Sequence, residues 1–280
     1  MKKISRRSFL AAAAVSAAAL ALTACGGSSS SVASSVASSA AASSEAASTS
    51  AAAGELTTVV AGKLTMATNA TFPPYEMTTD SGDIEGIDID TAKAIAEKLG
   101  LELQVDDMDF DAALLSVQQG KADIVMAGVT VTDERKAVMD FSDSYATGIQ
   151  SIIVPNDSDI ASPDDLAGKK IGTQRGTTGY IYCSDDFGED SVVAYDSGLT
   201  AVQALNNGQV DAVVIDNAPA TEYVAANPGL KVLDTSYAEE DYAIGMAKGS
   251  ALEDAVNKAL EELKADGTLQ AIVDKYINAN

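Results

Sequence analysis

The chain contains no histidine and no tryptophan, and after residue 25 its only arginines are Arg135 and Arg175. Without histidine it cannot form a Ser–His or Cys–His pair, the common arrangement for activating a nucleophile. Its 18 Lys and Arg are outnumbered by 41 Asp and Glu, which gives a formal net charge of −23. Phosphate backbones are bound by concentrated positive charge, so this composition excludes nucleic acid as a partner.

Cysteine is scarce as well, with only Cys25 and Cys183 in the sequence. A single thiol in the body of the chain cannot form an intrachain disulfide, and we interpret Cys183 as a buried structural residue. The acids at 107, 109 and 111 begin like a calcium loop, but Ala112 and Gln118 stand where that loop requires glycine and glutamate. The sequence therefore predicts no metal and no cofactor.

Residues 1–25 have the features of an export signal. Four positive charges lie within the first seven residues, and the apolar stretch over residues 9–22 is too short for a comfortable membrane span. The stretch ends in Leu-Thr-Ala-Cys25-Gly, which resembles the lipobox of bacterial lipoproteins, where the cysteine is acylated and becomes the new N-terminus. The alternatives are a plain secretory signal and an uncleaved anchor. The Arg6-Arg7 pair resembles a twin-arginine motif, so both the general and the twin-arginine export routes stay open.

Residues 26–55 are almost entirely small residues such as serine and alanine. Such a segment buries too little apolar surface to offset its ordering entropy, which predicts a disordered tether. With Cys25 lipidated, the protein is expected to be anchored to the outer face of the bacterial cell membrane.

From residue 56 onward, strand-like and helix-like segments alternate, which indicates an α/β fold with largely parallel sheets. The helix over residues 90–99 is expected to be capped by Asp90 and stopped by Gly100. Strands are expected at 63–68, 101–105, 124–127, 170–173, 191–195 and 211–215, and further helices at 112–119, 200–207 and 218–227.

One pattern occurs twice. Residues 115–126 and 202–215 each contain a helix end, a glycine, an aspartate two or three residues later, and a buried strand. This indicates two similar α/β lobes. A polar cluster follows each strand, Gly128–Arg135 in the first unit and Asp216-Asn217 in the second. Ligands of open α/β sheets bind beyond the carboxyl ends of strands, so two such ends predict a cleft.

Arg135 makes the first of these clusters a candidate carboxylate site. A guanidinium fork, backbone N–H groups and the Thr130 hydroxyl could together replace the water around a small anion. The alternative is a solvated arginine at the start of a polar helix.

Eight short motifs, in order and at compatible spacing, resemble those of the polar amino-acid solute-binding proteins of ABC importers (extracellular family 3, type II periplasmic-binding fold). They are Ala67–Glu76, Gly86–Asp90, Met108–Asp111, Ala127–Arg135, Asp140–Tyr145, Gly176–Gly179, Ile215–Asn217 and Asp266–Thr268. The resemblance implies two α/β lobes joined by two hinge strands. Lobe 1 would be residues 56–146 plus 243–280 and lobe 2 residues 147–242, with hinges near 145–149 and 242–244.

The resemblance also implies how a ligand is held. Arg135 and Thr130 would bind the α-carboxylate of an amino acid, and Asp216 with backbone at Gly128 would bind its α-ammonium. This is physically sensible, because an unpaired charge in a dry cleft costs several kcal/mol. Gly176–Gly179 opens an expected helix whose N-terminus suits an anion. The full ligand-binding set is Asn69, Phe72, Phe110, Ala127, Gly128, Thr130, Arg135, Gln174, Thr177, Thr178 and Asp216.

The ligand side chain would lie between Phe72 and Phe110, two positions that are aromatic in the family. Asn69 stands where several relatives carry an aspartate that contacts the distal group of the ligand. A neutral residue there favours a polar neutral ligand, similar to glutamine or cystine. Gln174, at a wall position, can donate and accept hydrogen bonds.

A cationic ligand such as arginine, lysine or histidine is the alternative, because Asp109, Asp111 and Glu76 are near enough in sequence to restore negative charge. Arg175 neighbours the site, and we interpret it as solvated.

In function, the resemblance implies a monomeric, non-enzymatic receptor that captures an amino acid by hinge closure. It would deliver the ligand to an ABC permease and, through it, to an ATPase subunit. Two other classes stay open: a partner of a ligand sensor, and an enzyme similar to the cyclohexadienyl dehydratases that share this fold. Co-purification with a histidine kinase would support the first, and turnover of prephenate-like substrates the second.

Overall fold

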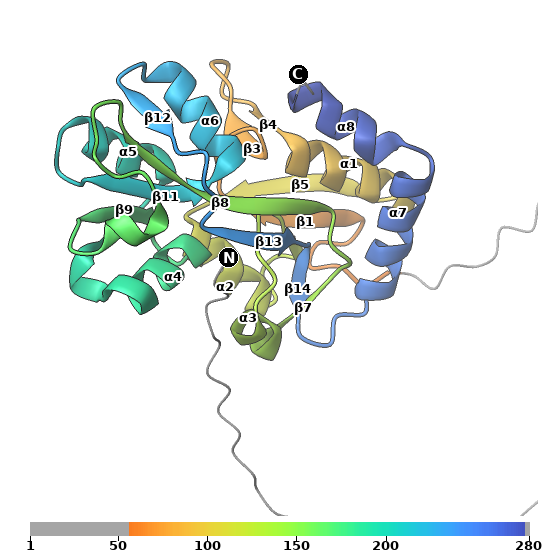
Figure 1. Ribbon diagram of the computed structural model, residues 1–280. Helices are drawn as coiled ribbons and strands as arrows, with labels where there is room; N and C mark the ends of the chain where they lie inside the picture. The colour runs from red at the N-terminus through yellow and green to blue at the C-terminus, as the bar shows by residue number, and fades with distance from the viewer. Residues whose placement is uncertain (1–55, 278–280) are drawn as a thin grey trace, which may run out of the picture. The chain divides into compact units, whose positions relative to one another are not determined.

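The computed structural model describes residues 56–277, all of which belong to one compact unit. The predicted signal peptide, the tether and the lipidated Cys25 lie outside these residues. Two sheets dominate the fold, and a short three-stranded sheet lies apart from them (Figure 1). The small sheet consists of β2 (Thr71–Phe72), β3 (Glu76–Thr78) and β4 (Ile84–Glu85).

The first sheet forms the core of what we call the first lobe. Its strands, in spatial order, are β5 (Glu102–Asp107), β1 (Lys63–Thr68), β6 (Ile124–Val125), β14 (Gly245–Ala247) and β7 (Met139–Phe141). β5, β1 and β6 are parallel, whereas β14 runs antiparallel to both of its neighbours. The helices of this lobe are α1 (Ile87–Leu99), α2 (Phe110–Gln118), α3 (Asp133–Val138), α7 (Glu253–Ala265) and α8 (Thr268–Tyr276).

The two faces of β1 explain how this sheet is covered. Leu64 and Met66 are fully buried in the cluster that includes the apolar residues of α1 and α7, whereas Ala67 points into the cluster of α2. Successive side chains of a strand point to opposite faces, so one short apolar strand packs against helices on both sides.

The second sheet forms the core of the second lobe. Its strands are β10 (Val192–Tyr195), β9 (Ile171–Gln174), β11 (Ala212–Asp216), β8 (Ala146–Pro155) and β12 (Leu230–Val232), and β13 (Ala238–Tyr242) also pairs with β8. β10, β9 and β11 are parallel, and β8 is antiparallel to its partners β11, β12 and β13. The helices are α4 (Thr178–Phe187), α5 (Gly198–Asn206) and α6 (Asn217–Ala226), with single 3₁₀ turns at Pro163–Leu166 and Glu189–Ser191.

β11 alternates between the two faces of this sheet. Val213 and Ile215 pack in the cluster of α5 and α6, while Val214 packs on the opposite side with Cys183 of α4. Cys183 is fully buried, as the sequence analysis expects of a structural cysteine.

The repeated pattern of the sequence is a repeated structure. Asp123 receives a hydrogen bond from the backbone N–H of Thr65 (2.8 Å) just before β6, and Asp211 receives one from Lys170 N (2.7 Å) just before β11. Each aspartate thus ties the start of its strand to the neighbouring parallel strand. The carboxyl ends of β6 and β11 carry the two polar clusters, so the repeat positions the site.

β8 and β13 lie side by side in the second sheet (Figure 1), and the chain passes to and from the first sheet at their paired ends. The Ala146–Tyr242 pair is where their ladder ends. The predicted lobe boundaries fall at these two residues, and the division itself stays a prediction.

Two expectations about local structure are wrong. α1 begins at Ile87, because Gly86 takes a positive φ of 140° where a Cβ would overlap the Tyr75 backbone, and the helix starts directly after it. Asp90 is therefore inside the helix and pairs with Lys275 Nζ (2.7 Å) instead of capping it. The sheets are also less parallel than expected, since antiparallel strands complete both of them.

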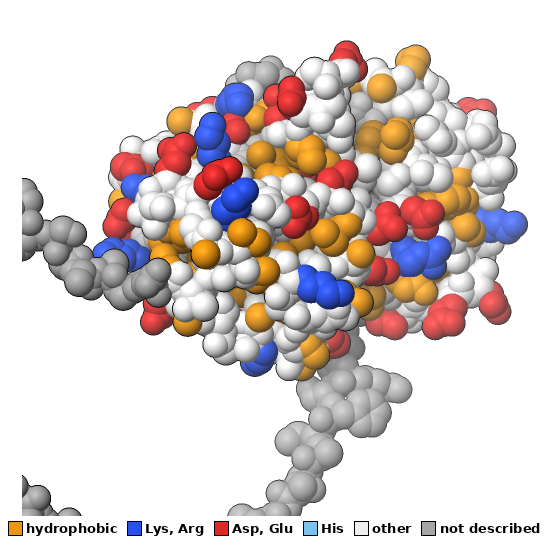
Figure 2. All heavy atoms as spheres, turned by 180° about the vertical axis from the view of Figure 1, so that it is seen from behind, with side chains coloured by type: hydrophobic (Ala, Val, Ile, Leu, Met, Phe, Trp, Pro, Cys, Tyr) orange, Lys and Arg blue, Asp and Glu red, His pale blue; other side chains and the backbone are white. Residues whose placement is uncertain are grey.

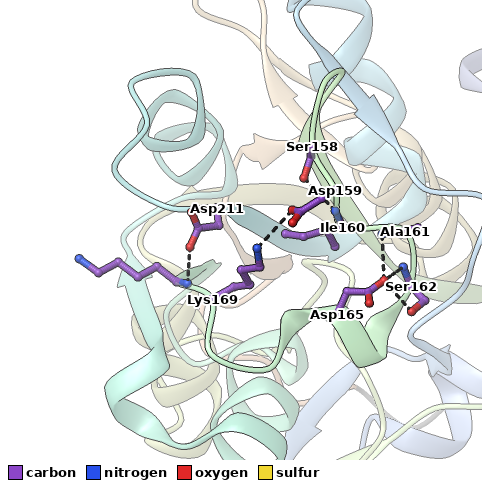
Figure 3. A network of polar contacts seen from close by, with 9 residues as sticks. Ser158, Asp159, Ile160, Ala161, Ser162, Asp165, Lys169 and Asp211 are labelled. Atoms are coloured by element: carbon purple, nitrogen blue, oxygen red, sulfur yellow. Dashed lines mark hydrogen bonds and ion pairs between the residues drawn. The ribbon is translucent and has the colours of Figure 1, made fainter.

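The loop after β8 shows how exposed acids hold irregular backbone in the second lobe (Figure 3). The Asp165 carboxylate accepts from Ala161 N (3.1 Å) and from Ser162 N (3.0 Å), and Lys169 pairs with Asp159 (3.2 Å).

Figure 2 shows acidic and basic side chains interspersed over the back of the molecule, with apolar side chains between them. Between residues 56 and 277, no helix combines the length and the apolar composition that a bilayer crossing requires.

Candidate ligand-binding site

A cavity lies between the two lobes and is lined by residues of both. All eleven residues that the sequence predicts as ligand-binding line it: Asn69, Phe72, Phe110, Ala127, Gly128, Thr130, Arg135, Gln174, Thr177, Thr178 and Asp216. Five further lining residues were not in the predicted set: Glu76, Gln150, Val214, Ile215 and Tyr242. Ligand binding by the eleven predicted residues stays a prediction.

Arg135 reaches the cavity from α3, which the Thr132 side chain caps by accepting from Arg135 N (3.2 Å). Its guanidinium donates from Nη1 to Thr130 O (2.8 Å) and from Nη2 to Gly176 O (3.2 Å) across the lobes. It also lies over the Phe110 ring, 5.4 Å from the centroid. Arg135 is only 9% exposed, and no described carboxylate oxygen lies within 4.0 Å of it. A buried cation with unused donors is therefore aimed at the cavity.

Asp216 is the opposite charge, contributed by the second lobe at the junction of β11 and α6. Its Oδ1 accepts from Ala218 N (3.0 Å) and its Oδ2 from Ile149 N (2.7 Å). Burial raises the pKa of Asp216 to about 6, against the lowering effect of these two hydrogen bonds. Among residues 56–277, no lysine or arginine nitrogen lies within 4.0 Å of its carboxylate. Asp216 thus has no basic partner within 4.0 Å, as Arg135 has no acidic one.

Glu240 on β13 is a polar side chain at the site that sequence reasoning missed. Its Oε2 accepts from Thr130 Oγ1 (3.0 Å) and from Gln150 Nε2 (2.9 Å), and Glu240 is buried. The pKa of the Arg135 guanidinium is lowered by burial, and Glu240 opposes that effect. The signal that could have found it is the two-residue period of β13, which places Glu240 on the same face as the buried Tyr242.

The Thr130 hydroxyl donates to Glu240 in this structure. The resemblance assigned this hydroxyl to the ligand carboxylate, a role that would require it to turn away from Glu240. The Thr178 hydroxyl of the second lobe also lies 3.4 Å from the Thr130 hydroxyl.

Asn69 and Gln174 form a bridge between the lobes at another part of the cavity wall. Gln174 Nε2 donates to Asn69 Oδ1 (2.9 Å), Thr71 Oγ1 donates to the same oxygen (2.9 Å), and Asn69 Nδ2 donates to Met108 O (2.9 Å). With its oxygen accepting twice, the Asn69 amide is held in one orientation.

The Phe72 ring belongs to β2 and packs against the apolar clusters of both lobes. It stacks on Tyr75 at 5.7 Å between centroids. Gly128 lies directly against it: the residue has a φ of 55°, and a Cβ there would stand 2.7 Å from Phe72 Cε1. Glycine at position 128 is therefore required twice, by its backbone conformation and by the ring.

The N-terminus of α4 reaches the cavity through Thr177 and Thr178. Thr177 Oγ1 caps the helix by accepting from Tyr180 N (3.3 Å), and it donates to Gln174 O (2.8 Å). Gly176 has a φ of 74° and approaches Asp111 of the first lobe so closely that a side chain would not fit. The positive end of the α4 dipole therefore lies near the Arg135 guanidinium.

Of the three acids that could restore negative charge, Glu76 alone lines the cavity. Asp109 and Asp111 line a separate cleft with Arg175, which is exposed and lies 3.8 Å from the Asp196 carboxylate. Glu76 is fully buried, and apart from the Asp88 carboxyl neither of its oxygens has a hydrogen-bond partner among the described residues.

Comparison with known proteins places these features in a family. A family model of bacterial extracellular solute-binding proteins, family 3, matches residues 64–279. The L-cystine-binding protein TcyJ of Escherichia coli (strain K12) is 33% identical over 223 residues, 78% of this chain and 84% of that protein. The ABC transporter arginine-binding protein 1 of the same organism is 34% identical over 222 residues, 77% and 91% of the two chains. A solved ancestral arginine-binding protein bound to glutamine is 43% identical, with a TM-score of 0.72, covering 77% of this chain and 98% of that one.

Proposed function

Because this chain belongs to the bacterial extracellular solute-binding proteins of family 3, we propose that it captures one polar amino acid in the cavity and delivers it to an ABC permease. Its relatives are amino-acid-binding proteins of ABC transporters and not enzymes. The observation that carries the proposal is the pair of buried, unmatched charges at the two sides of the cavity. Arg135 suits an α-carboxylate, and Asp216 suits an α-ammonium.

The energetics favour a zwitterion over a simple anion or cation. Either kind of single charge would leave one of the two protein charges buried without a partner, which costs several kcal/mol. An α-amino acid neutralises both at once, and each charge-assisted hydrogen bond stabilises the complex by about 1.5–3 kcal/mol. Capture then closes the lobes over the ligand.

Closure is supported by contacts that join the lobes directly. Tyr223 OH donates to Thr71 O (2.5 Å), and the Gln174–Asn69 and Arg135–Gly176 hydrogen bonds also cross the cavity. β8 and β13 would act as the hinge strands. A shift from 1:99 open to 99:1 closed needs about 5.5 kcal/mol of differential affinity, which two charge-assisted bonds and the buried side chain can supply.

A polar neutral ligand, similar to glutamine or cystine, is our proposal for the side chain. The Asn69 oxygen, which would be the acceptor for a cation, is already occupied by the Gln174 and Thr71 donors. A cationic ligand is the second candidate, because the Glu76 carboxyl lines the cavity and its hydrogen-bond partner is another carboxyl, that of Asp88, rather than a basic group.

The test is a thermal-shift screen of the purified protein against the twenty amino acids, ornithine, citrulline and cystine, followed by calorimetric titration of each hit. Arg135→Ala should weaken binding by a factor of about one hundred to ten thousand, because two charge-assisted bonds are lost. Arg175→Ala is the matched control, since its side chain is exposed, and it should bind normally. Normal binding by Arg135→Ala would refute the site assignment.

Membrane anchoring through Cys25 is a separate part of the proposal, supported by the lipobox-like sequence alone. Cells grown with labelled palmitate should incorporate the label into the wild-type protein and not into Cys25→Ala, which should leave the membrane fraction. Equal labelling of the two proteins would show that Cys25 is not acylated.

A further inference from the structure

Glu76, which lines the cavity, and Asp88, which does not, are two buried carboxyl groups that hydrogen-bond each other. Glu76 begins β3 and is fully buried, and no other described residue donates to its oxygens. Asp88, on the first turn of α1, is also fully buried. Its Oδ2 accepts from Gly128 N (3.1 Å) and Tyr145 OH (2.8 Å), whereas no residue of 56–277 other than Glu76 donates to its Oδ1. Apart from the hydrogen bond between the two carboxyl groups, three of the four oxygens therefore lack a donor.

No basic group compensates Glu76. No lysine or arginine nitrogen in the described part of the chain lies within 4.0 Å of its carboxyl. The titratable groups that face it from the surrounding elements are acids and phenols: Asp88 on α1, Asp107 at the end of β5, Asp216 at the end of β11, Tyr75 before β3, Tyr145 before β8 and Tyr223 on α6.

Glu76 is therefore the member of the pair that carries a proton. Burial, and then the neighbouring Asp88, raise the pKa of Glu76 well above its usual value. The pKa of Asp88 is raised by burial only to about 6, because the bonds from Gly128 and Tyr145 favour its charged form. Two carboxyl groups that share a buried site cannot both be charged without a cation nearby.

We propose that Glu76 contacts the ligand side chain and changes its protonation state with the class of ligand. This rests on the proposed function, since it requires an amino acid in the cavity. As a neutral acid, Glu76 donates its proton to the hydrogen bond with Asp88, and its carbonyl oxygen accepts a hydrogen bond from an uncharged polar side chain. When a cationic side chain enters, the O–H bond of Glu76 breaks, the electron pair stays on the carboxylate, and the proton leaves to the solvent.

This exchange keeps the net charge of the cavity constant, because the ligand brings one positive charge as one proton departs. Asp216 cannot take this role, since its two oxygens already accept backbone hydrogen bonds and the α-ammonium is expected there. Asp88 does not line the cavity. One cavity can thus receive both ligand classes, in keeping with an ancestral arginine-binding relative that was solved with glutamine bound.

The experiment is isothermal titration of the full chain at pH 7.5 in phosphate and in Tris, two buffers that differ in ionisation enthalpy. The cationic probes are arginine and lysine, and the neutral probes are glutamine and cystine. We expect the arginine complex to release close to one proton and the neutral complexes close to none. Between pH 6 and 8, arginine affinity should rise by up to about tenfold per unit of pH, while the affinity for neutral ligands stays within threefold.

Glu76→Gln should abolish proton release and weaken arginine binding at least thirtyfold, and leave the neutral ligands within threefold. Glu85→Gln, on the next strand of the same small sheet, is the control and should change neither. Should Glu76→Gln fail to fold, Asp88→Asn gives a second reading. It removes the neighbouring charge, so Glu76 would ionise more easily and arginine would release fewer protons than it does from the wild-type protein at pH 7.5.

The outcomes separate this inference from the proposed function. Arginine binding without proton release, or neutral ligands binding while no cationic one does, overturns the inference and leaves an amino-acid receptor. Unchanged arginine affinity in Glu76→Gln overturns it too. If no amino acid binds the wild-type protein, the proposed function is wrong and the inference fails with it.

Discussion

Asp216 offers a direct test of the unmatched charge in the ligand-free cavity. Its pKa is raised by burial from an ordinary 3.8 to about 6, so the unfolded chain loses this proton at lower pH than the folded protein does. The folded state therefore becomes less stable, relative to the unfolded state, as pH rises from about 4 through 6. Above pH 7 the full penalty is about 3 kcal/mol, and at pH 4.5 it is about 1 kcal/mol.

Replacing Asp216 with asparagine removes this pH dependence. The variant also loses one of the two backbone hydrogen bonds, from Ile149 or Ala218, but that loss is a constant offset at all pH values. The free energy of unfolding of Asp216→Asn, minus that of the wild type, should therefore increase by about 2 kcal/mol between pH 4.5 and pH 8. Other acids with shifted pKa values, such as Asp88, contribute equally to both proteins and cancel.

The assay is urea denaturation of ligand-free protein at several pH values, with Asp185→Asn as a control whose side chain is exposed. A saturating amino acid should reduce the wild-type penalty, because its ammonium pairs with Asp216. A difference between Asp216→Asn and the wild type that stays within about 0.5 kcal/mol across this pH range would refute the argument that Asp216 is buried without a counter-ion.

Three further predictions concern closure, the repeated strands and the single buried thiol. Tyr223→Phe removes the hydrogen bond to Thr71 O that joins the lobes, so calorimetry should show about two- to twelvefold weaker ligand binding. Tyr180→Phe is the control and should bind the ligand as the wild type does. Equal affinities of Tyr223→Phe and the wild type would mean that this bond does not stabilise the closed form. In urea denaturation, Asp123→Ala should lower the free energy of unfolding by about 2–4 kcal/mol and Asp211→Ala by about 1 kcal/mol. The difference arises because Asp123 is buried and accepts hydrogen bonds from Val59 and Thr65, whereas Asp211 is exposed. A larger loss in Asp211→Ala than in Asp123→Ala would contradict this reasoning. Burial raises the pKa of Cys183 to about 12, so peptide mapping should find maleimide on residue 183 only after unfolding, and labelling of the native protein would disprove its burial.

The chain order of strands and helices was predictable because local signals agree with the fold. Gly100 ends α1 as expected, and the repeated glycine–aspartate pattern marks the strands at Ile124 and Ala212. The antiparallel partners were harder to predict. β13 carries the acids Glu239, Glu240 and Asp241, a composition that does not favour a strand, and its pairing with β8 is supplied by tertiary contacts.

The charged residues of the site were predicted only in part from local sequence. Arg135 and Asp216 follow strands whose carboxyl ends predict a cleft. The scarce arginine alone left a solvated side chain as the alternative, and the roles of both residues toward a ligand come from the resemblance to the solute-binding family. Glu240 has no such signal, because it reaches Thr130 only through the pairing of β13 with β8, over a sequence separation of 110 residues. Contacts of that kind depend on the whole fold.

The side-chain half of the site shows why residue type alone does not define specificity. From sequence, the neutral Asn69 predicts a neutral ligand, yet its oxygen is occupied by Gln174 and Thr71, so it is not free to contact a ligand in this structure. Glu76 carries a formal negative charge in the sequence, but burial and the neighbouring Asp88 raise its pKa. Electrostatic preference therefore depends on which acids of the cavity wall are ionised. Burial and pairing decide this, and neither can be read from the sequence alone.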